Sequence, residues 1–301
     1  MRYVLTALIV YLPFLVTCYA VGVIFWQGIG WLEVGLLVGM YVVTLFGVDV
    51  GYHRYFSHRS FKTGPLMESL LAILGMMSAQ GGLWYWVMDH PRHHKVSDRP
   101  GDIHSPHLSG TGFRNSLKGF YHSHIGWVFK VSDAAAIATP EMKAEFRRKL
   151  QNPFILRLAR LQLWWILAGL LIPGVIGGLI TYSWSGFLAG VIWGGFVRIF
   201  LVQQIMGFVN SLCHLTGRRP FITHDGDRST NVAWLAIASL GQSWHHNHHA
   251  FPSSATFRIE PWHIDLDAMI LWALEKMGVV WDVRRPTPAL VASKRRAIVG
   301  S

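Results

Sequence analysis

The sequence predicts an all-α membrane protein with four transmembrane helices in two hairpins. A cytosolic helical cap on these helices is expected to hold a histidine-rich site for two metal ions. Two observations predict this class. Hydrophobic residues make up 51% of the 301 residues and charged residues only 14%, a balance typical of a membrane protein and not of a soluble domain. The chain also has 16 histidines, and many of them gather in a few short segments.

Four apolar runs are long enough to cross a bilayer. Two short turns, at residues 27–30 and 183–186, separate them in pairs. The first run is longer than the hydrophobic part of a signal peptide and lacks a small-residue cleavage site, so we interpret it as a helix that spans the membrane. Spans are therefore expected at about 3–26, 31–52, 161–182 and 187–209. Residues 53–158 and 210–301 would form the cap of one integral membrane domain that covers residues 1–301.

The placement of basic residues indicates the orientation. No Lys or Arg lies between Arg2 and Arg54, or between Arg160 and Arg198, and these stretches contain the two short turns. The positive-inside rule then puts both termini and the histidine-rich segments in the cytosol, and we expect a bacterial inner membrane. The net charge of +11 could attract an acidic redox partner or bind the phosphates of a CoA thioester. Alternatively, it could reflect contact with anionic lipids. A nucleic-acid partner is not expected.

The segments between the second and third spans are mixed in character. Residues 64–86 are apolar but Gly-rich and are interrupted by Glu68 and Gln80. They predict a helix at the membrane interface or beneath the cap, not a span. Residues 126–130 and 141–149 are expected to form interfacial or cytosolic helices. Cys18 and Cys213 lie in or beside apolar helices, so no disulfide is predicted.

Two histidine boxes share a spacing of i, i+3 and i+4, which places three imidazoles on one face of a helix. These boxes are His90, His93 and His94, and His245, His248 and His249. Each is interpreted as half of a metal site. Single histidines elsewhere are more often ordinary polar residues, and we interpret the following ones in this way: His104, His107, His122, His124, His224, His246 and His263.

Two further histidine signals are looser. His53 and His58 lie on the expected extension of the second span, five residues apart. On an α-helix such a pair diverges by about 140°, so we expect the two side chains to serve different metal ions. Asn210 and His214, at i and i+4, lie at the end of the fourth span.

Nine candidate histidines are too many for one ion. Two first-row ions with four or five positions each, and one position left for water or substrate, match this number. Neutral nitrogen ligands with open positions suit iron that must meet oxygen, and they also suit zinc. The ligand type therefore leaves the identity of the metal open.

The boxes HxxxxH, HxxHH and HxxHH, together with NxxxH at the end of the fourth span, resemble those of the membrane-bound fatty-acyl desaturases of the stearoyl-CoA and acyl-lipid Δ9 type. The resemblance runs from about Gly51 to Pro252 and includes residues 51–61, 101–106, 123–127 and 248–252. It implies an enzyme that uses O2 to introduce a cis double bond, at the Δ9 position by type, into a long-chain acyl-CoA or acyl-lipid. It also implies two Fe2+ ions held by the nine histidines, with Asn210 reaching one iron through water.

The resemblance further implies a kinked tunnel for the acyl chain below the metals. Gln80 and Trp86 match positions that shape this tunnel. Met206 and Gly207 stand where the family often has Thr-Trp, so these four residues are the expected substrate-binding set. Because the Trp that is usual in the family is missing here, the length of the acyl chain and the position of the double bond stay open.

Three residues depart from the pattern of the boxes. Gln242 and His246 replace the Glu and Asn that are usual in the third box, and Pro91 replaces the Arg that usually follows the first histidine of the second box. His246 could be an additional supporting group, or it could disturb the site.

No side chain other than the metal ligands is expected to perform catalysis, because acid–base chemistry does not remove hydrogen from unactivated methylene groups. A reduced di-iron pair that activates O2 does so. The sequence contains no HPGG haem-attachment motif and no GxGxxG motif after a strand, so a ferredoxin or a cytochrome b5-like protein is expected to supply electrons. Two alternatives stay open: a related oxygenase (hydroxylase, ketolase or acetylenase), and a non-enzymatic metal carrier or sensor, which would need ligands along the spans.

Overall fold

The computed structural model describes residues 2–131 and 138–296. The described chain is mostly helical, as predicted. It falls into two compact units that alternate along the sequence. The first unit comprises Met1–Gly51, Ser69–Trp84 and Val128–Gln204, and the second comprises Tyr52–Glu68, Tyr85–Trp127 and Ile205–Ser301. Each unit is described by itself below.

Four helical stretches are long and apolar enough to cross a membrane: Tyr3–Gln27, Trp31–Ser57, Gln162–Thr181 and Trp184–His214. The first is α1 (Arg2–Gln27), the second joins α2 (Trp31–Phe46) to the π-helical η1 (Gly47–Ser57), and the third is α10 (Gln162–Thr181). The fourth joins α11 (Trp184–Gly190), the π-helical η4 (Val191–Val197), α12 (Arg198–Ser211) and the 3₁₀ turn η5 (Leu212–His214). The prediction of four spans is confirmed at the level of length and composition, whereas their pairing as hairpins and the cytosolic cap remain predictions.

The helical extension expected after the second span is present, whereas one predicted turn differs. The second span continues as helix to Ser57, because no Pro or Gly pair interrupts it after Val50. The predicted turn at residues 183–186 is wrong for its last three residues. The Ser183 hydroxyl accepts a hydrogen bond from the Gly186 N–H at 3.1 Å, so Ser183 caps α11 and the helix begins at Trp184.

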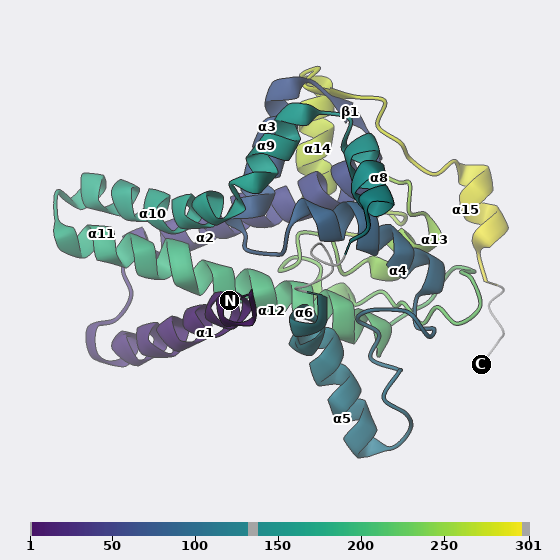
Figure 1. The fold of residues 1–301 in the computed structure, drawn as a ribbon, viewed down its shortest axis with the longest axis horizontal. Helices are drawn as coiled ribbons and strands as arrows, with labels where there is room; N and C mark the ends of the chain where they lie inside the picture. Colours follow the sequence, from purple (N-terminus) through teal and green to yellow (C-terminus); the bar gives the residue numbers. More distant parts are fainter. Residues whose placement is uncertain (1, 132–137, 297–301) are drawn as a thin grey trace. The chain divides into compact units, whose positions relative to one another are not determined.

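Within the first unit, α10 and α11 run side by side (Figure 1). Glycine makes this approach possible. A Cβ atom on Gly190 would lie 2.0 Å from the carbonyl oxygen of Pro173, and one on Gly177 would lie 2.3 Å from that of Gly186. Any larger side chain at either position would therefore push the two helices apart.

Arg198 is fully buried in the first unit and connects three of its segments. Its guanidinium donates to the carbonyl oxygens of Gly194 in its own helix (3.1 Å), Met77 (2.7 Å) and Gly169 in α10 (2.6 Å). Met77 ends α3 (Pro65–Met77), the short apolar helix that the sequence predicted near residues 64–86. The buried charge is thus fully hydrogen-bonded, as burial requires.

The remaining elements are short. The first unit also contains α8 (Pro140–Leu150) and α9 (Pro153–Arg160), and α6 (Trp127–Val131) lies at the border between the units. The second unit contains β1 (Lys62–Thr63), η2 (Tyr85–Asp89), α4 (His90–Val96), α5 (Phe113–Tyr121), η3 (His122–Gly126), η6 (Ala233–Leu235), α13 (His245–Ala250), α14 (Leu266–Lys276), β2 (Val280–Trp281) and α15 (Pro288–Lys294). β1 and β2 pair antiparallel. The helices expected at residues 126–130 and 141–149 are present.

A buried ion pair anchors η1 within the second unit. Arg54 Nη2 lies 3.0 Å from Asp265 Oδ1, and neither side chain is exposed. Arg54 also donates to the Ala255 carbonyl oxygen at 2.7 Å and lies over the Phe257 ring at 4.0 Å. Asp265 in turn accepts from the Ala268 N–H at 2.9 Å and caps α14. His53 is thereby held beside the segment that follows α13.

Candidate metal centre

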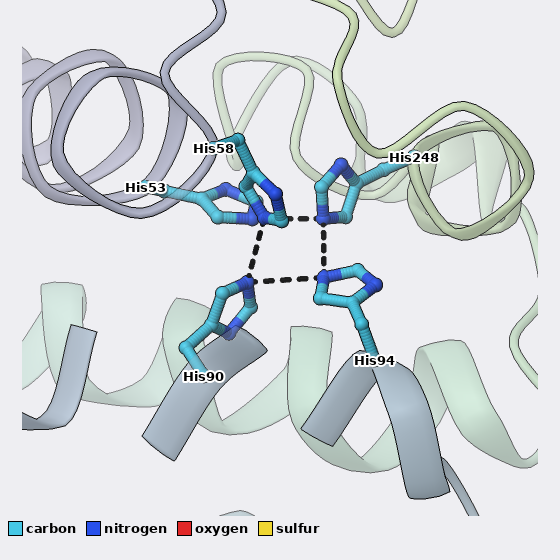
Figure 2. A group of neighbouring side chains, drawn as sticks. All are labelled: His53, His58, His90, His94 and His248. Carbon is cyan, nitrogen blue, oxygen red and sulfur yellow. Dashed lines mark hydrogen bonds between the residues drawn. The ribbon is translucent and has the colours of Figure 1, made fainter. Parts of the chain in front are cut away.

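Five histidines of the second unit converge with their Nε2 atoms facing one another (Figure 2). We call His53, His58, His90, His94 and His248 the first histidine group. Four Nε2–Nε2 distances within it are short: 2.9 Å for His53–His248, 3.0 Å for His58–His90, 3.1 Å for His90–His94 and 2.8 Å for His94–His248. The rings come from η1 and the turn after it, from α4 and from α13.

Four more histidines form a second convergence, which we call the second histidine group: His93, His214, His245 and His249. The Nε2 atom of His245 lies 3.0 Å from that of His214 and 3.1 Å from that of His249. The Nε2 atom of His93 is buried and makes no hydrogen bond. All nine histidines that the sequence selected are therefore brought together in two groups.

The prediction that His53 and His58 serve different metal ions is not what the geometry supports, because both lie in the first group. The cause is the π-helical conformation of η1, in which hydrogen bonds join residues five apart. The His58 N–H donates to the His53 carbonyl oxygen at 3.1 Å. The two side chains therefore lie on the same side of the helix, and their rings meet edge to face with centroids 4.9 Å apart.

The two HxxHH boxes are each divided between the groups and do not each form half of one site. In a helix, residues i and i+4 differ in direction by about 40°, whereas residue i+3 points about 60° to the other side. His90 and His94 accordingly enter the first group and His93 enters the second. In α13 the assignment is reversed, with His248 in the first group and the i, i+4 pair in the second.

The nitrogen distances fit a bound cation. Two imidazole nitrogens at about 2.0–2.1 Å from one ion, at right angles, would lie about 2.9 Å apart. A neutral imidazole Nε2 either donates one hydrogen or accepts one, and never both. At most two of the four contacts in the first group can therefore be hydrogen bonds. In the second group one hydrogen on His245 can serve only one of its two neighbours, so a shared cation satisfies both groups better than protons do.

Burial keeps five of these nine ligands unprotonated at neutral pH. Burial first, and then the neighbouring histidines, lower the pKa of His90, His94, His245 and His248 well below the usual value. Burial also lowers the pKa of His249 to about 4, against the opposing effect of Asp227. Neutral imidazoles with free lone pairs are the form that binds metals.

Three buried aspartates support the second group, and sequence reasoning did not select them. The carboxylates accept hydrogen bonds from Nδ1 atoms: Asp102 from His93 (2.9 Å), Asp98 from His214 (2.8 Å) and Asp227 from His249 (3.0 Å). Burial alone would raise the pKa of each aspartate, but the histidine partners hold it well below the usual value. Each Nε2 atom is consequently left with its lone pair toward the group. In the sequence, only the position of these aspartates in loops near histidines could have indicated their role.

Comparison with known proteins identifies the family. A family model described as fatty acid desaturase matches residues 29–282.

This chain belongs to the fatty acid desaturase family.

Curated relatives agree. The chain is 42% identical, over 95% of its own length and 87% of the other protein, to hex-5-enoyl-(acyl-carrier protein) acetylenase of Moorena producens (strain JHB). It is 34% identical to the sn-1 stearoyl-lipid 9-desaturase of Synechocystis sp. (89% and 77% of the two chains). It is 35% identical to Delta-9 acyl-lipid desaturase 1 of Arabidopsis thaliana (85% and 76%). The predicted family and the prediction of an oxidoreductase are confirmed. The four apolar helices agree with a membrane protein.

The other residues selected from the sequence do not gather in one place. The Trp86 ring packs at 5.8 Å from His53 and 5.4 Å from His90, centroid to centroid, against the first group. The Asn210 carbonyl accepts from Ser123 Oγ at 2.7 Å. Within residues 2–131 and 138–296 no hydrogen bond joins the Asn210 side chain to either group. Gln80, in the first unit, is half-buried.

Met206 and Gly207 lie on α12, and the glycine faces a neighbouring segment. A Cβ atom on Gly207 would lie 2.7 Å from His124 Cε1 and 2.8 Å from the His124 carbonyl oxygen. Its lack of a side chain thus allows α12 to approach η3. Met206 is buried. The substrate-binding roles of these residues remain predictions.

Of the three residues that depart from the family pattern, Gln242 and His246 are buried, whereas Pro91 is half-buried in the first turn of α4. His246 contacts Ser229 and the Phe221 backbone and belongs to neither group. Gln242 is buried, and its Nε2 makes no hydrogen bond. His104 is buried, and neither ring nitrogen makes a hydrogen bond. Its ring packs 4.1 Å from that of His93 between centroids, and its Nδ1 lies 3.9 Å from Asp102 Oδ1.

Proposed function

We propose that this member of the family is an oxygen-dependent fatty-acyl desaturase that introduces a cis double bond, at the Δ9 position, with two Fe2+ ions. One observation carries the proposal: nine histidines from four distant segments converge in two groups with Nε2–Nε2 distances of 2.8–3.1 Å. Iron held by neutral nitrogens would supply the oxidising power that acts on O2 and on the C–H bonds of a methylene group.

The side chains of the protein set the conditions for this chemistry. The histidines of both groups would hold the ions, and Asn210 would reach one of them through water. Trp86 packs against His53 and His90, so its indole would exclude bulk water from that side and press the acyl chain toward the first group. Gln80, Met206 and Gly207 are the other residues proposed for the acyl tunnel.

A lipid substrate is supported by the relatives whose names specify stearoyl-lipid and acyl-lipid groups. The acyl carrier would be a membrane lipid or CoA. Electrons would come from a separate ferredoxin or cytochrome b5-like protein. By the positive-inside rule, both termini and the site would lie in the cytosol. The spans would form two hairpins, and the membrane would be a bacterial inner membrane.

A second candidate is an acetylenase, which would remove two hydrogens from a carbon–carbon double bond and produce a triple bond. The relative with 42% identity carries this activity in its name, together with a hex-5-enoyl group on acyl-carrier protein. The same metal groups would serve both reactions. The two candidates differ in the substrate that the tunnel accepts, and a short acyl group on a carrier protein is the test substrate for the second.

Expression in a host that lacks its own desaturase, followed by mass spectrometry of the acyl groups, tests both candidates. New monounsaturated chains with the double bond at C9 support the first, and alkynyl products from a carrier-bound alkene support the second. Gain of an oxygen atom would contradict both. His94→Ala and His249→Ala, one from each group, should abolish the product, and near-normal turnover in either variant would remove that residue from the ligand set.

A further inference from the structure

The second histidine group is backed by a continuous network of three buried aspartates. Asp98, Asp102 and Asp227 each accept a hydrogen bond from a different histidine of that group, at 2.8–3.0 Å. Three of the four ligands at one proposed metal position are therefore oriented by a negative charge behind the ring. The inference that follows rests on the two-metal site proposed above.

The aspartates are also linked to one another. The Asp98 N–H donates to Asp102 Oδ2 at 2.8 Å, and the Arg228 N–H donates to Asp98 Oδ2 at 2.9 Å. Ser97 Oγ donates to Asp227 Oδ1 at 3.0 Å. The turn after α4 and the loop before η6 are thus joined through carboxylates. A shift of one aspartate would be passed to the others.

The remaining acceptor positions of these carboxylates are filled as well. Asp98 Oδ1 accepts from Ser105 Oγ at 2.7 Å, and Asp227 Oδ2 accepts from Ser229 Oγ at 2.7 Å. Ionised carboxylates with several donors are rigid acceptors in a buried site. Each bound Nδ1–H fixes the tautomer of its histidine and raises the basicity of the Nε2 atom that would face the metal.

We propose that Asp98, Asp102 and Asp227 are positioning residues for one metal position only, the one formed by His93, His214, His245 and His249. Loss of one carboxylate charge should release the ion of the second group and leave the ion of the first group in place. The two metal positions would then load with separable affinities.

The test is a titration of the full-length, detergent-purified apoprotein with Co2+ alone, followed by visible absorption and by metal analysis per chain. Wild-type protein should bind two ions. In Asp227→Asn, one binding step should weaken by about 10- to 100-fold, the usual effect of losing such a partner, and the other step should not change. Asp227→Ala should weaken that step further, because it removes the acceptor as well as the charge.

Two sets of variants distinguish a loss of histidine positioning from a general loss of folding. Asp225→Asn, an exposed carboxylate two residues away, is the matched control and should keep both steps. Asp98→Asn and Asp102→Asn act through other histidines and should weaken the same step as Asp227→Asn. Should Asp227→Asn fail to fold, these two variants carry the test.

A variant in the first histidine group shows which metal-binding step belongs to which group. His94→Ala should retain one ion, and the double variant His94→Ala/Asp227→Asn should lose that ion too. The inference is overturned if wild-type protein binds two ions and the aspartate variants keep both steps or weaken both equally. Fewer than two ions in the wild-type protein would contradict the two-metal site itself, and the inference with it.

Discussion

At the scale of single residues, His246 shows how a histidine next to two proposed ligands is directed elsewhere. Its Nδ1 lies 3.0 Å from Ser229 Oγ, and its Nε2 lies 3.0 Å from the carbonyl oxygen and 3.2 Å from the nitrogen of Phe221. Burial lowers its pKa to about 4, so the ring is neutral at pH 7. Ser229 also donates to Asp227 at 2.7 Å, so His246 contacts the residue that supports this aspartate. His246 therefore supports Asp227, which in turn holds His249.

We expect His246→Asn to keep two metal ions and to retain desaturation. The shorter amide loses at least one of these hydrogen bonds, so the free energy of unfolding should fall by about 1–3 kcal/mol. Metal analysis, product profiling and thermal unfolding measure the three outcomes. A loss of metal and product as complete as in His245→Ala would instead make His246 a tenth ligand.

Gly207 is the second residue whose role the packing clarifies. Sequence reasoning expects Gly207→Trp to change chain length or double-bond position. In the fold, a Cβ atom at this position would meet the backbone of His124 at 2.8 Å. The first effect of any side chain is therefore a displacement of η3, whose residue Ser123 donates to the Asn210 carbonyl.

Gly207→Ala should lower the free energy of unfolding by about 1–3 kcal/mol, which is the usual result of overpacking. Thermal unfolding in detergent measures this change, and Gly64→Ala, where a Cβ atom meets nothing within 4 Å, is the matched control. An unchanged unfolding temperature together with an altered product profile would place position 207 against the acyl chain and not against His124.

At the scale of elements, the π-helical turn of η1 decides which ion His58 serves. In an α-helix the residue that stacks on His53 would be Ser57, at i+4, whereas in η1 it is His58, at i+5. The side chain of Ser57 points in another direction, and its single hydroxyl hydrogen is shared between the carbonyl oxygens of Tyr52, at 2.9 Å, and Trp86. The π-helical hydrogen bonding of η1 thus decides that His58, and not residue 57, faces the first histidine group.

Exchanging the two residues tests the register. The double variant Ser57→His/His58→Ser should lose metal from the first group, because a histidine at position 57 points toward Trp86. Ser57→Ala alone is the control for the lost hydroxyl and should keep both ions. Full metal content in the exchanged variant would mean that this stretch adopts an α-helical register in solution.

At the scale of the whole molecule, metal ions would connect segments that are far apart in the sequence. The first group joins η1, α4 and α13, and the second joins α4, η5 and α13. Without a cation, buried Nε2 lone pairs face one another and several stay without a hydrogen-bond partner. Such unsatisfied groups each cost about 1–3 kcal/mol.

Removal of metal should therefore lower the thermal stability of the protein. A site occupied at 100 times its Kd contributes about 2.7 kcal/mol, so the chelated protein should unfold at a lower temperature, and Fe2+ added without oxygen should restore it. The combined His94→Ala/His249→Ala variant should show little response to chelation. An equal unfolding temperature with and without metal would contradict the proposed bridging role.

The sequence by itself determined the class of the protein and the identity of its candidate ligands. Long apolar runs have few alternatives to membrane helices, because every backbone polar group must be satisfied inside the bilayer. Histidines at i, i+3 and i+4 share a helix face whatever the rest of the chain does. For this reason four spans and all nine clustered histidines could be selected before any fold was known.

Only the tertiary structure decided how these ligands are divided and what lies behind them. The α-helical angle assumed for His53 and His58 is replaced by a π-helical one, which brings a side chain five residues on back to the same side of the helix. Asp98 and Asp227 are 129 positions apart and look like loop residues, yet burial and hydrogen bonding bring them behind His214 and His249. Such pairings depend on contacts between distant segments, and local spacing carries no information about them.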